Sequence, residues 1–303
     1  MATRPTTLAG LVEAGAARLR EAGVAFGQGT TNAYDEAAWI VLGVLGVPFD
    51  RFEAQAARPA TPDDAARAAT AIERRVAERV PTAYQLGEAW LQGVRFLADR
   101  RSIVPRSYIG ELLADADEQG TLDAWLSDRT RRVLDLCTGN GSLAVLAAMA
   151  YPEVTVVGAD IDAEALALAR ANVALHRLEA RVRLVESDLF AALGHGEDGR
   201  FDLVLCNPPY VTDAAMAALP PEFRAEPALA LAGGADGMDV VRRIVGGVGR
   251  HCSTEGVLVL EIGRERAAFE AAFPSLEHAW LETSGGEDRV VLLTAEALAR
   301  HRP

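Results

Sequence analysis

The sequence predicts an α/β fold over its C-terminal two thirds, preceded by a small helical bundle. From residue 131 onward, strand-like apolar runs alternate with helix-like runs, a pattern typical of a parallel sheet covered by helices. Residues 1–81 instead carry apolar residues at helical spacing. The tetrapeptide Asn207-Pro208-Pro209-Tyr210 directly follows one predicted strand, at the end where open parallel sheets place their ligands. We therefore expect a binding site at that edge of the sheet.

Length and composition favour two domains. The chain has 303 residues, of which 50% are hydrophobic, and a domain typically holds about 150 residues. We expect a helical domain over residues 1–81, a β-hairpin linker over 82–105 and an α/β domain over 106–303. Because residues 1–81 lack clusters of polar residues that suggest chemistry, we expect them to dock a substrate.

The composition also bounds the compartment and the chemistry. No apolar run approaches the roughly 18 residues of a membrane span, and the N-terminus has no signal-peptide pattern. Cys137, Cys206 and Cys252 lack metal-ligand spacing and cannot all pair, so we expect a cytoplasmic protein with reduced thiols. The five histidines also lack ligand spacing, and no metal is expected.

The charges are unevenly distributed along the chain. All 30 basic residues are arginine, which excludes lysine Schiff-base chemistry and a Walker-type phosphate loop. Residues 1–101 hold 12 arginines and 12 acidic residues, so the whole net charge of −13 lies in residues 102–303. Such a surface repels a bare nucleic-acid backbone and attracts basic partners.

Local signals place the helices of the first domain. Apolar residues recur at helical spacing between Leu8 and Leu19. Asn32 is a candidate N-cap for a second helix that runs to residue 45. Thr61, followed by Pro62 and two acidic residues, is typical of the start of a third helix, which we expect to reach about residue 80.

The rest of the chain contains strand signals. Residues 82–86 and 90–96 are β-like and are separated by Gly87 and Glu88, which predicts a hairpin or an extended linker, and a helix is expected to begin near Tyr108. Seven strands are predicted over 132–137, 154–159, 182–185, 202–206, 257–262, 278–282 and 288–293. Helices are predicted over 143–150, 163–176, 238–250 and 264–272. Because only a short link separates the last two strands, we expect them to be antiparallel.

The glycine-rich segment 135–142 predicts a cofactor site. It closes a strand and opens a helix, and its glycines let a ligand approach the backbone closely. Gly139 and Gly141, with Asp160 about 20 residues further on, match a dinucleotide-binding fingerprint, in which the acid binds a ribose. The pattern by itself is therefore compatible with a nicotinamide dinucleotide.

Two acidic residues favour S-adenosylmethionine instead. Asp135 precedes the glycines at the strand end, where a carboxylate suits a ligand with an ammonium and a sulfonium and opposes a pyrophosphate. Asp188 follows the third strand of the sheet, where it can accept a hydrogen bond from the amino group of an adenine. Asp160 can bind the ribose hydroxyls of either cofactor.

The tetrapeptide after the fourth strand of the sheet is a rigid row of acceptors. Two prolines fix two φ angles and remove two donors, and Asn207 is kept extended by the proline that follows it. The Asn207 side-chain oxygen and the Pro208 carbonyl can together accept both hydrogens of an –NH2 group. Tyr210 can pack beside that group, and Pro209 keeps the loop rigid. The motif therefore predicts a site that presents a planar nitrogen to an electrophile.

With these motifs, the chain resembles the HemK-type protein N5-glutamine methyltransferases over nearly its whole length. Besides the glycine-rich segment and the Asn-Pro-Pro-Tyr motif, the resemblance rests on residues 32–37, 104–112, 222–227 and 233–237. It implies a Rossmann-like, seven-stranded class I methyltransferase domain that uses S-adenosylmethionine. Ser107 and Cys137 resemble the branch that modifies the third protein of the large ribosomal subunit, not the branch that modifies release factors.

The resemblance also implies the roles of individual residues. The candidate cofactor-binding residues are Asp135, Thr138, Gly139, Asn140, Gly141, Asp160, Ile161, Asp188, Leu189 and Asn207. The candidate catalytic residues are Asn207, Pro208, Pro209 and Tyr210, and the candidate substrate-binding residues are Asn207, Pro208, Tyr210 and Arg106. For Arg106 a substrate contact and a pair with an acid are both open. Glu226 either braces the active-site loop or lies in solvent.

Four other functions stay open at this point. A release factor as substrate would use the same catalytic residues. An adenine-N6 DNA methyltransferase can use the same tetrapeptide but needs a basic surface, which the acidic C-terminal part lacks. A nicotinamide-dependent oxidoreductase leaves the tetrapeptide unexplained, and a non-catalytic ribosome-assembly factor leaves the whole motif set unexplained. We expect a ribosomal protein or a pre-ribosomal particle as the partner, and neither DNA nor a membrane.

Overall fold

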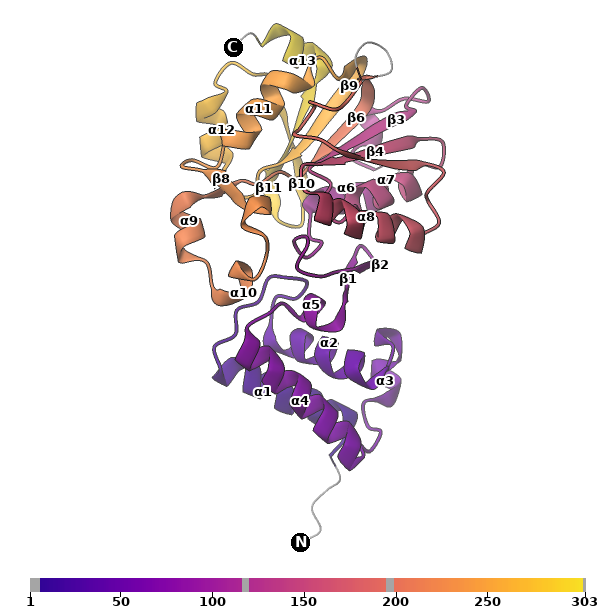
Figure 1. The fold of residues 1–303 in the computed structure, drawn as a ribbon, viewed down its shortest axis with the longest axis vertical. Coiled ribbons are helices and arrows are strands. Elements are labelled where there is room, and N and C mark those ends of the chain that lie inside the picture. Colours follow the sequence, from indigo (N-terminus) through magenta and orange to yellow (C-terminus); the bar gives the residue numbers. More distant parts are fainter. Residues whose placement is uncertain (1–5, 116–119, 195–198, 302–303) are drawn as a thin grey trace.

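The structure is a computed structural model that describes residues 6–115, 120–194 and 199–301. A helical N-terminal part, a short hairpin and an α/β part follow one another along the long axis of the molecule (Figure 1). The N-terminal part contains α1 (Leu8–Glu21), α2 (Ala33–Leu45), η1 (Phe49–Arg51), α3 (Phe52–Gln55) and α4 (Pro62–Glu78).

The N-terminal helices begin where their capping residues predict. The side chain of Asn32 accepts hydrogen bonds from the backbone N–H groups of Tyr34 and Asp35 at the start of α2. Thr61 and Asp64 form a reciprocal capping box at the start of α4. Helices α1, α2 and α4 then bury their apolar faces against one another in a core of their own. The predicted N-caps are thus confirmed.

The prediction for residues 82–86 is wrong, because they form the short helix α5 (Thr82–Leu86). Pro81 precedes the helix, and Gly87 ends it with a φ of 77°, a conformation that glycine adopts without strain. The hairpin lies after this helix and consists of β1 (Glu88–Leu91) and β2 (Val94–Leu97). Its two-residue turn is Gln92-Gly93, and both residues have positive φ, as the right-handed strand twist requires.

The central sheet has seven strands in the order β10-β11-β9-β6-β3-β4-β5. Their bounds are β3 (Arg132–Leu136), β4 (Thr155–Asp160), β5 (Val182–Glu186), β6 (Phe201–Cys206), β9 (Cys252–Glu261), β10 (Ala279–Thr283) and β11 (Gly286–Thr294). Strands β3, β4, β5, β6 and β9 are parallel, whereas β11 is antiparallel to both of its neighbours. The seven predicted strands and the antiparallel last pair are confirmed, although β9 begins five residues earlier than expected.

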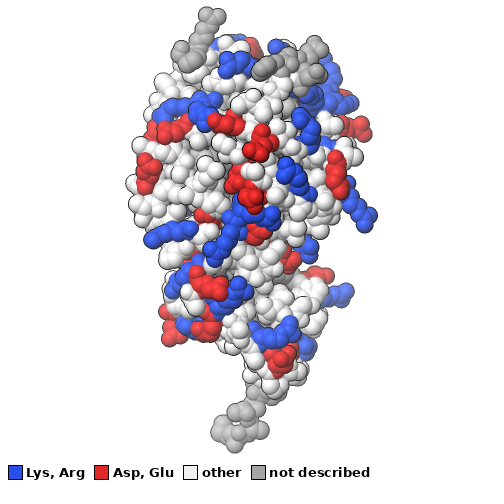
Figure 2. Space-filling model, viewed as in Figure 1, with Lys and Arg blue, Asp and Glu red and all other residues white. Residues whose placement is uncertain are grey.

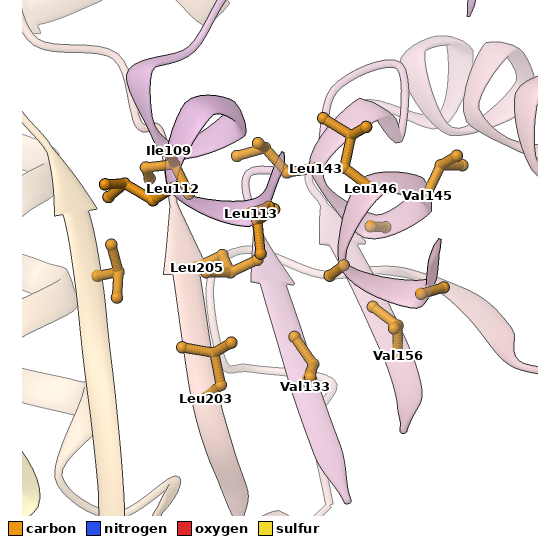
Figure 3. Close-up of a cluster of buried hydrophobic side chains, with 14 of the residues drawn as sticks. Ile109, Leu112, Leu113, Val133, Leu143, Val145, Leu146, Val156, Leu203 and Leu205 are labelled. Atoms are coloured by element: carbon orange, nitrogen blue, oxygen red, sulfur yellow. The ribbon is translucent and has the colours of Figure 1, made fainter. Parts of the chain in front are cut away.

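Helices cover both faces of this sheet (Figure 1). One face carries α6 (Tyr108–Ala114), α7 (Ser142–Ala150) and α8 (Ala163–Leu175), and the other carries α11 (Asp239–Val248), α12 (Arg266–Ala272) and α13 (Ala295–Arg300). Figure 3 shows Ile109 and Leu112 of α6 on the same side of the sheet as Leu143 of α7, above Leu203 and Leu205 of β6. The result is the three-layer arrangement of a doubly wound sheet.

A segment between β6 and β9 leaves the sheet and reaches the N-terminal part (Figure 1). It contains β7 (Val211–Thr212), α9 (Asp213–Ala218), α10 (Pro221–Arg224), η5 (Ala228–Ala230) and β8 (Ala232–Gly234). Glu222 of α10 accepts hydrogen bonds from the Ala25 N–H at 3.2 Å and from Arg79 Nη1 at 3.0 Å. The sequence contains no clear signal for these elements, because each of them has at most six residues.

Candidate active site

The predicted site residues gather at the carboxyl edge of the parallel strands. Strand β3 lies between β4 and β6, and the chain order reverses at this point of the sheet. Open α/β sheets bind their ligands in the crevice at such a reversal. The crevice is a cavity of about 910 Å³, including its solvent-open mouth, and we call it the glycine-loop cavity. Gly139, Asp160, Asp188 and Asn207 all contribute to its wall.

The glycine-rich segment forms a tight loop between β3 and α7. Gly139 and Gly141 have φ angles of 54° and 80°. A side-chain carbon at Gly139 would lie 2.9 Å from the hydroxyl of Ser102, so only glycine lets the loop pass this close to the linker. Cys137 also has a positive φ, of 60°, which is why β3 ends one residue earlier than the predicted strand.

Asp135 lies beneath this loop and is completely buried. Its Oδ2 accepts hydrogen bonds from Thr138 Oγ1 at 2.5 Å and from the Ala144 N–H at 2.9 Å. Its Oδ1 has no hydrogen-bond partner among the residues that the structure describes. Burial raises the pKa of Asp135 to about 7, and the hydrogen bonds to Thr138 and Ala144 oppose this shift. Asp135 therefore supports the loop from below, with one carboxylate oxygen unsatisfied.

The next two acidic residues face the cavity. Asp160 ends β4 and accepts from the Gly139 N–H at 2.8 Å and from the Asp162 N–H at 2.9 Å, while burial raises its pKa. Asp188 follows β5 and is exposed, and both of its oxygens lie 2.8 Å from Arg243 Nη2. The acids thus stand on two neighbouring strand ends, as the sequence predicts.

The other candidate cofactor residues divide into two groups. Ile161, Leu189 and Asn207 line the glycine-loop cavity, as does Pro209, which was predicted as a catalytic residue. Thr138, Asn140 and Gly141 do not line it, because they build the loop itself. Asn140 is buried, and its carbonyl oxygen accepts a hydrogen bond at 2.9 Å from Asn172 of α8.

Asn207 lies where this cavity meets a second one, and Ile103 and Ala230 also line both cavities. The second cavity, of about 1550 Å³ including its open mouth, lies between the hairpin, the N-terminal part and the sheet edge, and we call it the hairpin cavity. Asn207 lines both cavities, whereas Pro208 and Tyr210 line only the hairpin cavity. The Asn207 Nδ2 group donates to the Arg106 carbonyl oxygen at 3.3 Å. This bond fixes the amide so that Oδ1 is the free acceptor.

Tyr210 is held by a buried acid. Its hydroxyl donates to Glu261 Oε1 at 3.2 Å, and Glu261 Oε2 accepts from Ser107 Oγ at 2.6 Å and from the Tyr108 N–H at 2.9 Å. Burial raises the pKa of both Tyr210 and Glu261. A side-chain carbon at Gly263 would lie 2.5 Å from the Tyr210 ring. The ring is therefore fixed by a hydrogen bond at one end and by close packing on its side.

Arg106 is paired with an acid. Its Nη1 and Nη2 donate to Glu226 Oε1 at 2.6 Å and Oε2 at 2.7 Å, and its guanidinium lies over the ring of Phe223. The sequence left open whether Arg106 contacts the substrate or pairs with an acid, and the structure shows the pair with an acid. Glu226 is buried and does not lie in solvent. Both Arg106 and Phe223 still line the hairpin cavity.

Sequence reasoning missed two residues of the site. Glu261 ends β9 at the same sheet edge as Asp160 and Asn207, and an acid at the end of a parallel strand was a signal that could have found it. Arg243 lies inside α11, and no local motif marks it.

The glycine-loop cavity fits a nucleoside with a cationic tail. Ile103, Ile161 and Leu189 give it an apolar wall, and Asp160 and Asp188 supply acceptors. The two arginines in its lining, Arg101 and Arg243, are already paired with Asp99 and Asp188. The buried Asp135 Oδ1 without a partner lies under the same loop. Such a lining disfavours a pyrophosphate.

Within residues 6–115, 120–194 and 199–301, no group of three or more His, Cys, Asp or Glu side chains could hold a metal ion. No helix in these ranges is long and apolar enough to span a bilayer. On the face in Figure 2, acidic and basic side chains are interspersed.

Comparison with known proteins identifies the family. The family model "Methyltransferase small domain" matches residues 119–262. A ribosomal protein uL3 glutamine methyltransferase of Bordetella pertussis is 48% identical over 294 residues, which cover 96% of each chain. The enzyme of the same name from Burkholderia pseudomallei is 47% identical over 305 residues and 98% of each chain.

A solved structure shares the fold. The hMettl16 catalytic domain in complex with a 3'UTR hairpin superimposes with a TM-score of 0.50 at 14% identity, over 77% of this chain and 81% of that one. It supports the Rossmann-like architecture of the sheet and its helices. Because its curated relatives are similar to it over nearly their full length, the chain belongs to the ribosomal protein uL3 glutamine methyltransferase family.

Proposed function

We propose that this enzyme transfers a methyl group from S-adenosylmethionine to the side-chain amide nitrogen of a glutamine in ribosomal protein uL3. The observation that carries the proposal is the position of Asn207 on both cavities. A side chain there can hold a substrate amide from the hairpin cavity while facing a cofactor in the glycine-loop cavity. The family membership supports the same reaction.

The cofactor supplies an electrophilic methyl group when bound. Asp160 suits its ribose hydroxyls and Asp188 its adenine amino group, while Ile161 and Leu189 suit the faces of the base. The negative charge near the glycine loop suits the amino-acid tail. The arginines in the cavity wall do not oppose these assignments, because Arg243 is paired with Asp188 and Arg101 with Asp99.

The chemical difficulty is that an amide nitrogen is a poor nucleophile, because its lone pair is delocalised into the carbonyl. Asn207 Oδ1 and the Pro208 carbonyl oxygen accept hydrogen bonds from the two N–H groups of the glutamine amide. These bonds direct the amide nitrogen toward the glycine-loop cavity. Turning the nitrogen out of conjugation costs free energy, which binding of the substrate elsewhere offsets. Alignment of the reacting atoms is then the main contribution of the protein.

No general base is needed at the methyl-transfer step, and the methylated amide nitrogen then releases its extra proton to water. Glu261 is the acid nearest to Tyr210, and it already accepts hydrogen bonds from Tyr210, Ser107 and Tyr108. It therefore orients the Tyr210 ring, which packs beside the amide and stabilises the developing positive charge.

The proposed partner agrees with the charge of the enzyme. The excess of 13 acidic residues lies after residue 101 and suits a basic ribosomal protein or a pre-ribosomal particle. The helical N-terminal part forms one wall of the hairpin cavity through Gly27, Gly29 and Thr31, which supports its assignment as the docking domain. A ribosomal substrate also implies a reaction in the cytoplasm, and we propose neither DNA nor a membrane as partner.

The decisive experiment is transfer of labelled methyl from S-adenosylmethionine into an extract of cells that lack this enzyme, followed by mass spectrometry. We expect label on a glutamine of uL3. Label on a release factor would keep the mechanism and replace the substrate, and label on DNA would replace the substrate class. Cofactor binding without label in any fraction would contradict the proposed activity and favour a role in ribosome assembly.

A further inference from the structure

The short segment 222–226 connects the N-terminal part to the active site. Glu222, at its first position, is completely buried and faces the N-terminal part. Its Oε1 accepts from Arg79 Nη1 at 3.0 Å and from the Ala25 N–H at 3.2 Å, and Arg75 Nη1 lies 3.8 Å away. Its carbonyl oxygen accepts from Gln28 Nε2 at 3.3 Å. One end of the segment is thus held by the N-terminal helices and the loop after α1.

The middle of the segment contacts both sides at once. The Phe223 ring lies under the guanidinium of Arg106, 5.7 Å from its central carbon. A side-chain carbon at Gly27 would lie 3.1 Å from the tip of the same ring. Phe223 is thus packed between the N-terminal part and Arg106, in the wall of the hairpin cavity.

The far end of the segment holds the residue that orients Asn207. Glu226 accepts hydrogen bonds from both terminal nitrogens of Arg106, at 2.6 and 2.7 Å. Its Oε1 also accepts a hydrogen bond from the Val104 N–H at 2.8 Å. The Val104 bond holds the backbone before Pro105, and the two other bonds hold the side chain of Arg106 after it. The carbonyl oxygen of Arg106 is in turn the acceptor for Asn207 Nδ2.

From this chain of contacts we infer that Glu226 is a positioning residue, which holds the Arg106 carbonyl in place and thereby orients the Asn207 side chain for its substrate. Segment 222–226 makes that orientation depend on the N-terminal part. The inference rests on the proposed function, because Asn207 is assigned to the substrate amide there. Glu226 does not line either cavity, so it acts through Arg106 and not by contact with the substrate.

The test is a double-mutant cycle between Glu226→Gln and Asn207→Ala. Glutamine keeps the size of the side chain but loses the charge-assisted pair with Arg106. We expect kcat on uL3 to fall by about tenfold or more, since a small misplacement of a reacting group is enough for such a loss. The affinity for S-adenosylhomocysteine should change less than about twofold, because Glu226 lies outside the glycine-loop cavity.

In the Asn207→Ala background, Glu226→Gln should lower kcat by less than about twofold more, because the residue through which it acts is already gone. Losses that multiply, or a parallel loss of cofactor affinity, would overturn the inference in favour of a general structural role. Glu255→Gln is the matched control, because Glu255 forms a similar pair with Arg129 at 2.7 Å on the exposed surface. It should leave kcat unchanged.

A second variant and a second readout keep the test decisive. Should Glu226→Gln fail to fold, Arg106→Lys keeps the charge but loses the bidentate pair, and it should show a smaller kcat loss that is again absent in Asn207→Ala. Crystal structures of the wild type and of Glu226→Gln test, without an activity measurement, whether Glu226 holds Asn207 against the Arg106 carbonyl oxygen. A retained Asn207–Arg106 hydrogen bond in the variant would overturn the inference, even if the wild type modified no glutamine and the proposed function failed separately.

Discussion

At the scale of single residues, the buried carboxyl group of Asp135 has a consequence for stability. Burial raises its pKa to about 7 in the folded chain, whereas an aspartate in an unfolded chain has a pKa of about 3.9. Between these two values the folded state binds more protons than the unfolded state. The contribution of Asp135 to the free energy of unfolding therefore decreases as the pH rises from about 4 to about 7.

We expect Asp135→Asn to remove this dependence. Relative to the wild type without cofactor, the variant should gain stability by a few kcal/mol between pH 5 and pH 8, since a pKa shift of one unit corresponds to about 1.4 kcal/mol. Denaturant unfolding at both pH values measures the difference. Because burial also raises the pKa of Asp160 and Glu261, only the difference between the two proteins isolates Asp135. A difference that is independent of pH would contradict the assigned shift.

Asn207 carries the substrate amide in the proposed mechanism. We expect Asn207→Ala to reduce turnover by about 100-fold or more, as removal of a positioned hydrogen-bond partner does in other active sites. Binding of S-adenosylhomocysteine, measured by calorimetry, should change little, because the rest of the cavity wall is intact. If affinity and turnover fell together, Asn207 would have a structural role instead.

Gly263 tests how closely Tyr210 must be packed. Its φ is 57° and an added side-chain carbon would lie 2.5 Å from the Tyr210 ring. Gly23 has nearly the same φ, 61°, but an added carbon there meets no atom within 4 Å. Both alanine variants should lose about 1 kcal/mol of stability from backbone strain. Only Gly263→Ala should lower the rate of methyl transfer, by about tenfold, and equal rates in the two variants would show that the ring position is not critical.

At the scale of the elements, capping chemistry was readable from the sequence and the β-like composition of residues 82–86 was misleading. Asn32 and Thr61 each satisfy backbone N–H groups within three residues, so their effect is local and visible in the chain. Residues 82–86 adopt a helix between Pro81 and Gly87, and Thr82 there donates to the buried Glu36 at 2.7 Å. That partner is 46 residues away, and no local rule contains it.

Thr61 gives a prediction at this scale. Thr61→Ala should lower the free energy of unfolding by about 1 kcal/mol, because it removes the capping-box bond to the Asp64 N–H. Thr61→Ser keeps the hydroxyl and should stay within a few tenths of a kcal/mol of the wild type. Urea unfolding of the two variants measures the cap. Turnover should be unchanged in both, and a loss of turnover would mean that α4 contributes to the site.

At the scale of the whole molecule, a buried ionic cluster joins the N-terminal part to the α/β part. Arg75 donates to Glu36 at 2.7 Å and lies 3.8 Å from Glu222, and all three side chains are almost completely buried. Arg79 adds a partly exposed donor at 3.0 Å. Buried charges of this kind are costly when one partner is lost.

Glu222→Gln should therefore lower the free energy of unfolding by about 3 kcal/mol. This is the lower end for a broken buried pair, because water can solvate the partly exposed Arg79. Glu73→Gln is the control, because Glu73 pairs with Arg18 at 2.6 Å on the surface, where solvent screens the pair and its loss should have little effect. Thermal and denaturant unfolding compare the two. Equal effects would mean that the cluster does not hold the two parts together.

By itself the sequence determined the order of the seven sheet strands and the capped starts of α2 and α4, and it named the candidate residues of the site. Apolar periodicity, the glycines of the loop and the Asn207 motif act within a few residues, so they can be read along the chain. The sequence also placed Asp160 and Asn207 at strand ends, where parallel topology brings them to one edge.

Tertiary structure alone decided which groups meet across long separations. The pair of Arg106 with Glu226 spans 120 residues, and the hydrogen bond between Tyr210 and Glu261 spans 51. Both depend on how the segment after β6 folds back onto the linker and on the strand order, and neither leaves a periodic trace in the sequence. Burial of charge adds to this: Asp135 has its raised pKa because the loop and its neighbours exclude water from it.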